Sequence, residues 1–330
     1  MEERKRKIHV KGSLALAFSL LCWCSIPIFL RAFVDDIDGW VANGVRYPFA
    51  TLLWMFPLLH LARKGEVTRK IFTLAIIPAI VNTIAQVFWA WAPYYMQPGM
   101  LMFLGRVSIL FSILASFALF PDERALIRSR AFWSGLLLCA VGFISINIFK
   151  GALDSSTTWF GLLIVLGHGI TVGFYGVSVR HYMRGIKPWI SFPVISIYTS
   201  VVLFIMMWIL GEPSDMLGMT SPRLILLALS SIFGIALGHV AFYYAIEHLG
   251  VAISVSTGLL MPFITSIASY YIYGETFTLP QLSAGIILLV GAGLVLRAQL
   301  HLGEHYSPAP TVEEVAEIEA FSGVNEPHNR

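Results

Sequence analysis

Charged residues are scarce in this sequence. Lys, Arg, Asp and Glu make up 12% of the 330 residues, against 57% for hydrophobic residues, and the mean hydropathy is +0.76. A soluble domain carries about a quarter charged residues, so this chain has too few to cover a surface of its own. The charges also fall between apolar runs of roughly 18–25 residues, the length that crosses a hydrocarbon core as a helix. The composition therefore predicts an all-α membrane protein that crosses the bilayer many times.

Acidic residues are missing from the middle of these runs, since all 19 Asp and Glu fall in loops, in tails or at the ends of runs. A cation carried through a membrane needs a carboxylate there, so we expect no cationic substrate. The three cysteines, Cys22, Cys24 and Cys139, lie within apolar runs and form no disulfide framework. The sequence shows no metal cluster, phosphate-binding loop or nucleophile–base pair. We therefore expect no enzyme, no cofactor and no metal.

The apolar runs allow ten spans with short loops between them. They cover residues 12–30, 40–61, 71–92, 98–120, 131–149, 158–180, 188–210, 222–246, 250–273 and 280–300. The basic segment 1–11 with the run after it resembles a signal peptide, but the run is long for one, so we expect an uncleaved first span. The tail, 301–330, is acidic and polar, which predicts disorder.

Lysine and arginine are unequally distributed over the predicted loops. Seventeen lie on one side of the spans and three on the other, with Arg46 and Arg106 left inside the membrane. The positive-inside rule places the richer side, and with it both termini, in the cytoplasm. The expected location is the cell membrane, specifically a bacterial inner membrane.

Two halves of the chain resemble each other. The segment "ASFALFPDE" (115–123) is similar to "ASYYIYGE" (268–275), and "SGLLLCAVGF" (134–143) is similar to "AGIILLVGAG" (284–293). The predicted repeats cover 12–149 and 150–300 with five spans each, an odd number, so the second must be inverted in the membrane. Inverted repeats are a common plan of secondary transporters, which bind their solute near the midplane.

Several segments resemble the EamA-type branch of the drug/metabolite transporter superfamily. They are "LLCW" around Trp23, "GVRYPFATLLW" with Arg46, "VAFYYAIEHLGVAISVSTGLLMPFITSIASYYIYGE" with Pro262 and Glu275, and "GIILLVGAGLVL". The resemblance covers about residues 12–298 and implies ten helices, cytoplasmic termini, alternating access and transport of a small metabolite, often outward. It does not supply the substrate. Two positions depart from the family: Cys24 replaces a glycine, and the fourth span has Arg106 and no proline equivalent to Pro262.

Polar side chains at membrane depth are the candidate substrate-binding residues. Arg106 is the one ionisable residue in 100–120, and a guanidinium facing a cavity can bind a carboxylate through two N–H groups. Helical spacing places further candidates on shared faces, and interhelical hydrogen bonding is the alternative role for these. The candidates are Arg106, Arg46, Asn82, Gln86, Trp89, His168 and Tyr175, with His239 and Tyr243 as an inner gate.

Three functions remain open at this point. The first is a secondary transporter, specifically an exporter, of a small organic metabolite that carries a carboxylate. The second is a broad-specificity drug exporter that binds apolar ligands through aromatic residues, and the third is a polytopic membrane sensor or enzyme. The third lacks the signalling domain or the interfacial cluster of acids and histidines that it would need. The expected partners are a small-molecule solute and the lipid bilayer, with no nucleic acid; a homodimer is left open.

Overall fold

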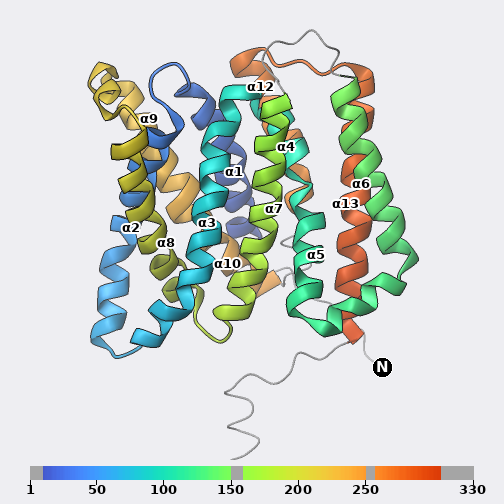
Figure 1. The fold of residues 1–330 in the computed structure, drawn as a ribbon, viewed down its shortest axis with the longest axis horizontal. Coiled ribbons are helices and arrows are strands. Elements are labelled where there is room, and N and C mark those ends of the chain that lie inside the picture. Colours follow the sequence, from blue (N-terminus) through green and yellow to red (C-terminus); the bar gives the residue numbers. More distant parts are fainter. Residues whose placement is uncertain (1–9, 150–158, 250–256, 306–330) are drawn as a thin grey trace, which may run out of the picture.

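The computed structural model describes residues 10–149, 159–249 and 257–305, and every regular element in these ranges is a helix (Figure 1). The N-terminal segment 1–9 and residues 306–330 of the predicted tail lie outside the described residues, whereas 301–305, predicted to belong to a disordered tail, are part of the last helix. The elements are α1 (Val10–Ala32), α2 (Gly39–Arg63), α3 (Arg69–Tyr95), α4 (Pro98–Gly105), α5 (Ser108–Leu119), η1 (Pro121–Arg128), α6 (Arg130–Ile148), α7 (Trp159–Tyr182), α8 (Pro188–Leu210), η2 (Pro213–Gly218), α9 (Ser221–Ser231), η3 (Ile232–Leu237), α10 (Gly238–Leu249), η4 (Gly258–Leu260), α12 (Met261–Tyr273) and α13 (Leu279–His305).

Within the described ranges, seven helical segments are long and apolar enough to cross a membrane. They are Val10–Ala32, Arg69–Tyr95, Pro98–Leu119, Trp159–Tyr182, Trp189–Leu210, Ser221–Phe242 and Leu279–Ala298, and two shorter apolar helices cover Arg130–Ile146 and Gly258–Tyr273. The expected all-α, multi-pass membrane protein is therefore confirmed. The number of ten spans stays a prediction.

Two of the predicted continuous spans are interrupted in the structure. Residues 98–120 form α4 and α5, separated by a turn at Arg106 and Val107 whose N–H groups bond to the carbonyls of Phe103 and Leu104 at 3.2 and 3.1 Å. This i→i−3 pattern is tighter than an α-helix. Residues 221–249 contain a π-helical turn, η3, between α9 and α10. Both irregularities are of a kind that often marks a functional position in a helix.

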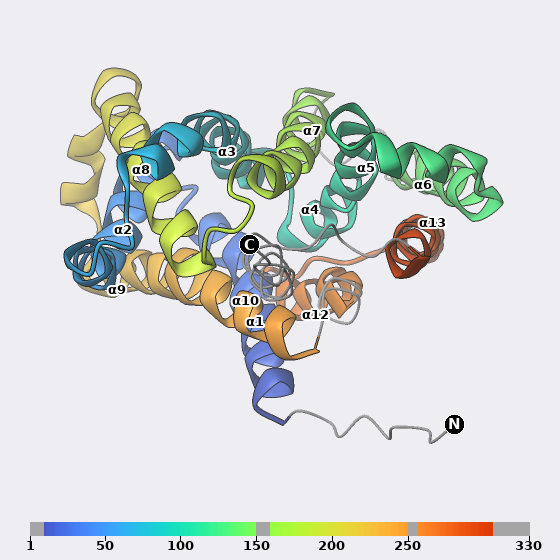
Figure 2. The same cartoon turned by 90° about the horizontal axis from the view of Figure 1, so that it is seen from below.

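Helices from the two halves of the chain pack against each other throughout the bundle. Figure 2 shows α2, α8 and α9 at one end of the molecule and α6 with α13 at the other. The main pairs are α2 with α8, α3 with α7, α1 with α10, α4 with α12, and α6 with α13. The last pair is close because glycines face it: a Cβ on Gly142 would lie 2.5 Å from the backbone nitrogen of Leu288. Small residues let membrane helices approach in this way.

Candidate functional site

Arg106 lies at the break between α4 and α5, and its side chain points toward α12. Its Nε donates to the carbonyl of Met102 at 3.3 Å, and its Nη1 donates to the carbonyl of Gly258 at 3.4 Å. The same Nη1 lies 3.9 Å from the sulfur of Met261. Among the described residues, no carboxylate forms a salt bridge with Arg106, and its Nη2 has no hydrogen-bond partner. A guanidinium has five N–H donors, so this one can still bind an anion.

The surroundings of Arg106 are apolar and aromatic. Cys24, Met102 and Met261 belong to a buried cluster against which Trp23 and Trp89 pack. The Trp89 ring in turn stacks on His168, with ring centroids 4.6 Å apart and an interplanar angle of 28°. Arg106 contacts two members of this cluster, Met102 and Met261, against which Trp89 packs. The structure thus brings together Arg106, Trp89 and His168, three of the residues proposed from the sequence.

Asn82 and Gln86 lie in a hydrogen-bonded network between α2, α3 and α8. The Asn82 amide donates to the Thr199 hydroxyl at 3.1 Å and accepts from the Gln86 amide at 3.3 Å. Asn43 donates to the backbone carbonyl of Gln86 at 2.7 Å. These contacts join helices, as buried amides commonly do in membranes. Sequence reasoning found the shared face of α3 but not these partners on other helices.

Arg46 is 1% exposed and lies apart from Arg106. Its Nε donates to the Ser230 hydroxyl at 2.8 Å, and its Nη2 donates to the Ser230 carbonyl at 3.4 Å. Gly234, in the π-helical turn, lies close to Ile26 and Arg46, because a Cβ there would lie 2.8 Å from Cγ1 of Ile26 and 3.4 Å from Nη2 of Arg46. Arg46 therefore joins α2 to α9, while Arg106 contacts α12. A role of Arg46 in binding solute stays a prediction.

His239 lies in a group of aromatic rings. It stacks on Phe192 with centroids 4.7 Å apart and meets Trp23 edge-on at 5.3 Å. Its Nδ1 lies 2.9 Å from the carbonyl of Ile235, within the π-helical turn. The side chain of Tyr243, its proposed gate partner, lies outside the described residues. Tyr175 packs along α7 against a buried cluster that contains Ile71, Ala75 and Ile195.

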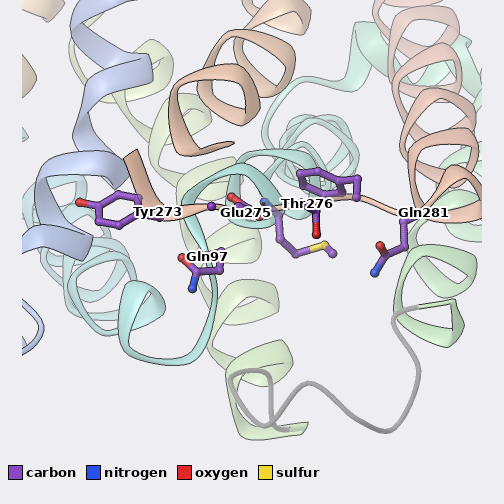
Figure 3. Close-up of a pocket in the computed structure, with 8 residues that line it drawn as sticks. Gln97, Tyr273, Glu275, Thr276 and Gln281 are labelled. Carbon is purple, nitrogen blue, oxygen red and sulfur yellow. Dashed lines mark hydrogen bonds between the residues drawn. The ribbon is translucent and has the colours of Figure 1, made fainter. Parts of the chain in front are cut away.

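A polar pocket of about 190 Å³ lies at the N-terminal end of α4 (Figure 3). Gln97 lines it from one side, and Glu275 and Thr276 line it from the segment that follows α12. The Gln97 Oε1 is buried without a hydrogen-bond partner in the described part of the chain. None of these residues was proposed from the sequence as a ligand. Glu275 alone carried a signal, because it is one of the residues of the family resemblance.

Comparison with known proteins agrees with this architecture. Residues 159–297 match the model of the EamA-like transporter family. A curated protein of Haemophilus influenzae, described as an uncharacterized transporter, is 25% identical over 198 residues, which cover 58% of this chain and 64% of that protein. The match thus spans just under two thirds of that relative's length. A solved crystal structure of another protein has the same fold, with a TM-score of 0.58 and 13% identity over 89% of this chain and 99% of that one.

The fold defines this chain as a helical, multi-pass membrane protein. Its residues 159–297 match the model of the EamA-like transporter family. The resemblance to EamA-type transporters that the sequence motifs indicate is therefore confirmed.

Proposed function

We propose that the protein is a secondary transporter that exports a small organic metabolite bearing a carboxylate, by alternating access of one site to the two sides of the cell membrane. The family of residues 159–297 and the relative described as a transporter support the general activity. The proposed substrate class depends on one observation. Arg106 is a membrane-embedded guanidinium with free donors and no salt bridge among the described residues.

A carboxylate would satisfy this guanidinium. A charge at membrane depth costs several kcal/mol unless it is hydrated or paired, and the described bonds of Arg106 go only to two carbonyls and a thioether. An anionic group can accept two parallel N–H bonds from the planar fork. The stacked rings of Trp89 and His168 provide a flat apolar surface near this charge. The proposed site thus accepts a molecule with one anionic end and an apolar body.

Matching contacts in the two halves support the two inverted repeats that alternating access needs. The Ser19 hydroxyl on α1 donates to the carbonyl of Gly238 at 3.0 Å, and His168 on α7 bonds to the carbonyl of Ala85 at 3.1 Å. The two pairs correspond: His168 lies 149 positions after Ser19, and Gly238 lies 153 positions after Ala85, close to the offsets of 150 and 153 between the similar segments of the two halves. The packing of α1 on α10 corresponds in the same way to that of α7 on α3.

Residues close to the pseudo-twofold axis between two repeats should contact the equivalent residue of the other repeat. The hydroxyls of Thr51 and Ser200 do so at 2.6 Å and are separated by 149 positions in the chain. The thiol of Cys139 bonds to the carbonyl of Leu288 at 3.5 Å, again 149 positions away. A pseudo-twofold axis between α2 and α8 and between α6 and α13 accounts for both contacts. We therefore assign the first repeat to 12–149 and the second to 150–300.

The broad drug exporter is the second candidate, because aromatic rings gather around Trp23, Trp89 and His239. The two candidates differ in the need for Arg106, since an apolar drug gains nothing from a guanidinium. Solute binding by purified protein, with chemically matched carboxylate, amide and apolar ligands, separates them. A transporter for carboxylates binds the acid and not its amide, whereas a drug exporter prefers the apolar ligand.

The proposed orientation has both termini in the cytoplasm. It can be tested at two exposed positions in loops at opposite ends of the bundle, Lys64 after α2 and Glu212 after α8. Lys64→Cys should react with a membrane-impermeant thiol reagent only in inverted vesicles, and Glu212→Cys only in intact cells. The opposite pattern would overturn the orientation, and labelling of both from one side would overturn the predicted spans between them.

A further inference from the structure

Glu275 caps a helix from the other half of the chain. It follows Gly274, which ends α12 with a positive φ of 69°. Its Oε2 accepts from the backbone N–H of Gly99 at 2.8 Å, and its Oε1 accepts from that of Met100 at 2.9 Å. These N–H groups belong to the first turn of α4 and have no partner within that helix. The carboxylate thus binds the positive end of the α4 dipole through two charge-assisted hydrogen bonds.

The two helices are in close contact at this point because residue 99 is glycine. A Cβ on Gly99 would lie 2.6 Å from the hydroxyl of Ser266 on α12 and 2.8 Å from Oε2 of Glu275. Both distances are shorter than real Cβ atoms show, and the backbone Cα of Ser266 would lie only 3.0 Å away, so a side chain at residue 99 would displace Ser266 and the Glu275 carboxylate and press on the backbone of α12. Gly99, which has no side chain, and the carboxylate of Glu275 therefore both favour the close contact between α4 and α12.

The contact forms one end of a seam between α4 and α12, which run antiparallel. Glu275 and Gly99 lie at one end of the seam, and Gly258 and Arg106 lie at the other. Beyond Arg106 the chain leaves α12, because α5 packs on α7, η1 and α13. Figure 1 shows α4 and α12 together at the end of the bundle away from the N-terminus, with α5 below them. The seam thus closes the bundle between Arg106 and the Glu275 end.

The seam also joins two groups of helices. α1 packs on α10 and α12, whereas α7 packs on α3 and α5. In an alternating-access protein such groups must separate at one end of the site and approach at the other. The Glu275 carboxylate belongs to the first group. We count α4 with the second group because it leads directly into α5 and packs on α7, although it also contacts α1. Separation at this end requires both hydrogen bonds to break.

We propose that Glu275 is the latch of the outer gate: its carboxylate, bound to the N-terminus of α4, holds the pathway closed between Arg106 and the outer face. This inference rests on the proposed alternating access, and it assigns to Glu275 a conformational role without contact to solute. Breaking the two bonds opens the seam and hydrates both the carboxylate and the α4 N-terminus. The pocket of about 190 Å³ beside Glu275 leaves room for water to enter there.

A native thiol can report on the seam. Cys24 lies at its inner end, is 4% exposed, and has its sulfur 3.7 Å from the carbonyl of Met261. With Cys22 and Cys139 replaced by alanine, the rate at which Cys24 reacts with a charged, impermeant methanethiosulfonate measures access from the side of addition. In intact cells Glu275→Gln should react about tenfold faster than the parent, the scale expected for the loss of one charge-assisted hydrogen bond. Glu212→Gln, a change at an exposed carboxylate in the loop after α8, is the matched control and should have no effect.

Gly99→Ala opens the same seam from the other helix and leaves the carboxylate in place. Its added methyl group meets Ser266 and Glu275, so this variant should also accelerate labelling of Cys24 from outside. Gly105→Ala, in the same helix, is its control, because a Cβ there has no neighbour within 4 Å. Size-exclusion profiles and thermal unfolding in detergent identify variants that fail to fold. Glu275→Gln and Gly99→Ala test the opening of the seam independently, because they alter its two opposite sides.

Two results would overturn the latch. One is equal labelling of Cys24 from outside in the parent, Glu275→Gln and Gly99→Ala proteins when all three are folded. The other is faster labelling only from the cytoplasmic side, measured in inverted vesicles. Solute uptake is measured separately. If labelling changes as expected but the protein transports no solute, the proposed function is refuted and the latch is supported.

Discussion

Replacement of Arg106 tests the proposed substrate class most directly. Glutamine is shorter, has no charge and offers one NH₂ group in place of the guanidinium fork. Hydrogen bonds to charged groups are worth about 1.5–3 kcal/mol each, and each 1.4 kcal/mol is a factor of ten in affinity. If one such bond is lost, Arg106→Gln should bind a carboxylate solute about 10- to 100-fold more weakly. The side chain gives up only two long bonds, at 3.3 and 3.4 Å, so stability should change little.

Arg106→Lys separates charge from geometry. Lysine keeps the positive charge but not the planar fork, so its affinity should fall between those of the parent and Arg106→Gln. The assay is equilibrium binding of the solute to purified protein, with uptake into proteoliposomes and thermal unfolding as companions. Arg63→Gln, at the exposed end of α2, is the matched arginine control. Equal affinity of the parent and Arg106→Gln would refute the reasoning and make Arg106 a structural residue.

Further predictions concern stability, measured as the unfolding temperature in detergent. Gly142→Ala should destabilise the protein by about 1–3 kcal/mol, because its Cβ would lie 2.5 Å from the backbone nitrogen of Leu288. Gly176→Ala is the control and should not lower the unfolding temperature, because a Cβ there has no neighbour within 4 Å. Ser230→Ala should cost about 1–3 kcal/mol by leaving the buried Arg46 without its hydroxyl partner. Equal unfolding temperatures of Ser230→Ala and the parent would show that Arg46 is satisfied by other groups.

The positions of the helices could be predicted from the sequence, because length and hydropathy determine them. The predicted span 40–61 is α2, Gly39–Arg63, and 188–210 coincides with α8, Pro188–Leu210. The break at Arg106 and the π-helical turn could not be predicted in this way. A run of apolar residues shows that a segment is long enough to cross the membrane. It does not show whether each N–H bonds to the carbonyl three, four or five residues earlier.

The same limit applies to the candidate site. The spacing of Asn82 and Gln86 predicts that they share one face of α3, and their mutual bond of 3.3 Å agrees. Their partners on α2 and α8 depend on packing between helices, which one sequence does not show. The bonds from Gly99 and Met100 to Glu275 join residues some 175 positions apart, so only the fold reveals them.

The latch and the proposed solute site lie on the same two helices, which links them energetically. Gly99 and Arg106 are separated by seven residues of α4, or about 10 Å at the helical rise. A solute that binds the fork of Arg106 through Nη1 competes with the carbonyl of Gly258 for that group. Binding therefore weakens the contact at the inner end of the seam, whose outer end Glu275 closes. Coupling between two sites is reciprocal, so if solute shifts the opening of the seam, a change at Glu275 that opens the seam must also shift solute affinity, by at most the factor by which solute shifts the opening.

This reciprocity gives a last prediction. In the Cys22→Ala, Cys139→Ala background, a saturating carboxylate solute should change the outside labelling rate of Cys24, and Glu275→Gln should shift solute affinity in the corresponding direction although Glu275 does not touch the solute. The paired measurements are the labelling rate with and without solute and the binding isotherm of each variant. If Glu275→Gln opens the seam but leaves affinity unchanged, then solute binds the open and closed states equally, and the seam opens independently of the site at Arg106.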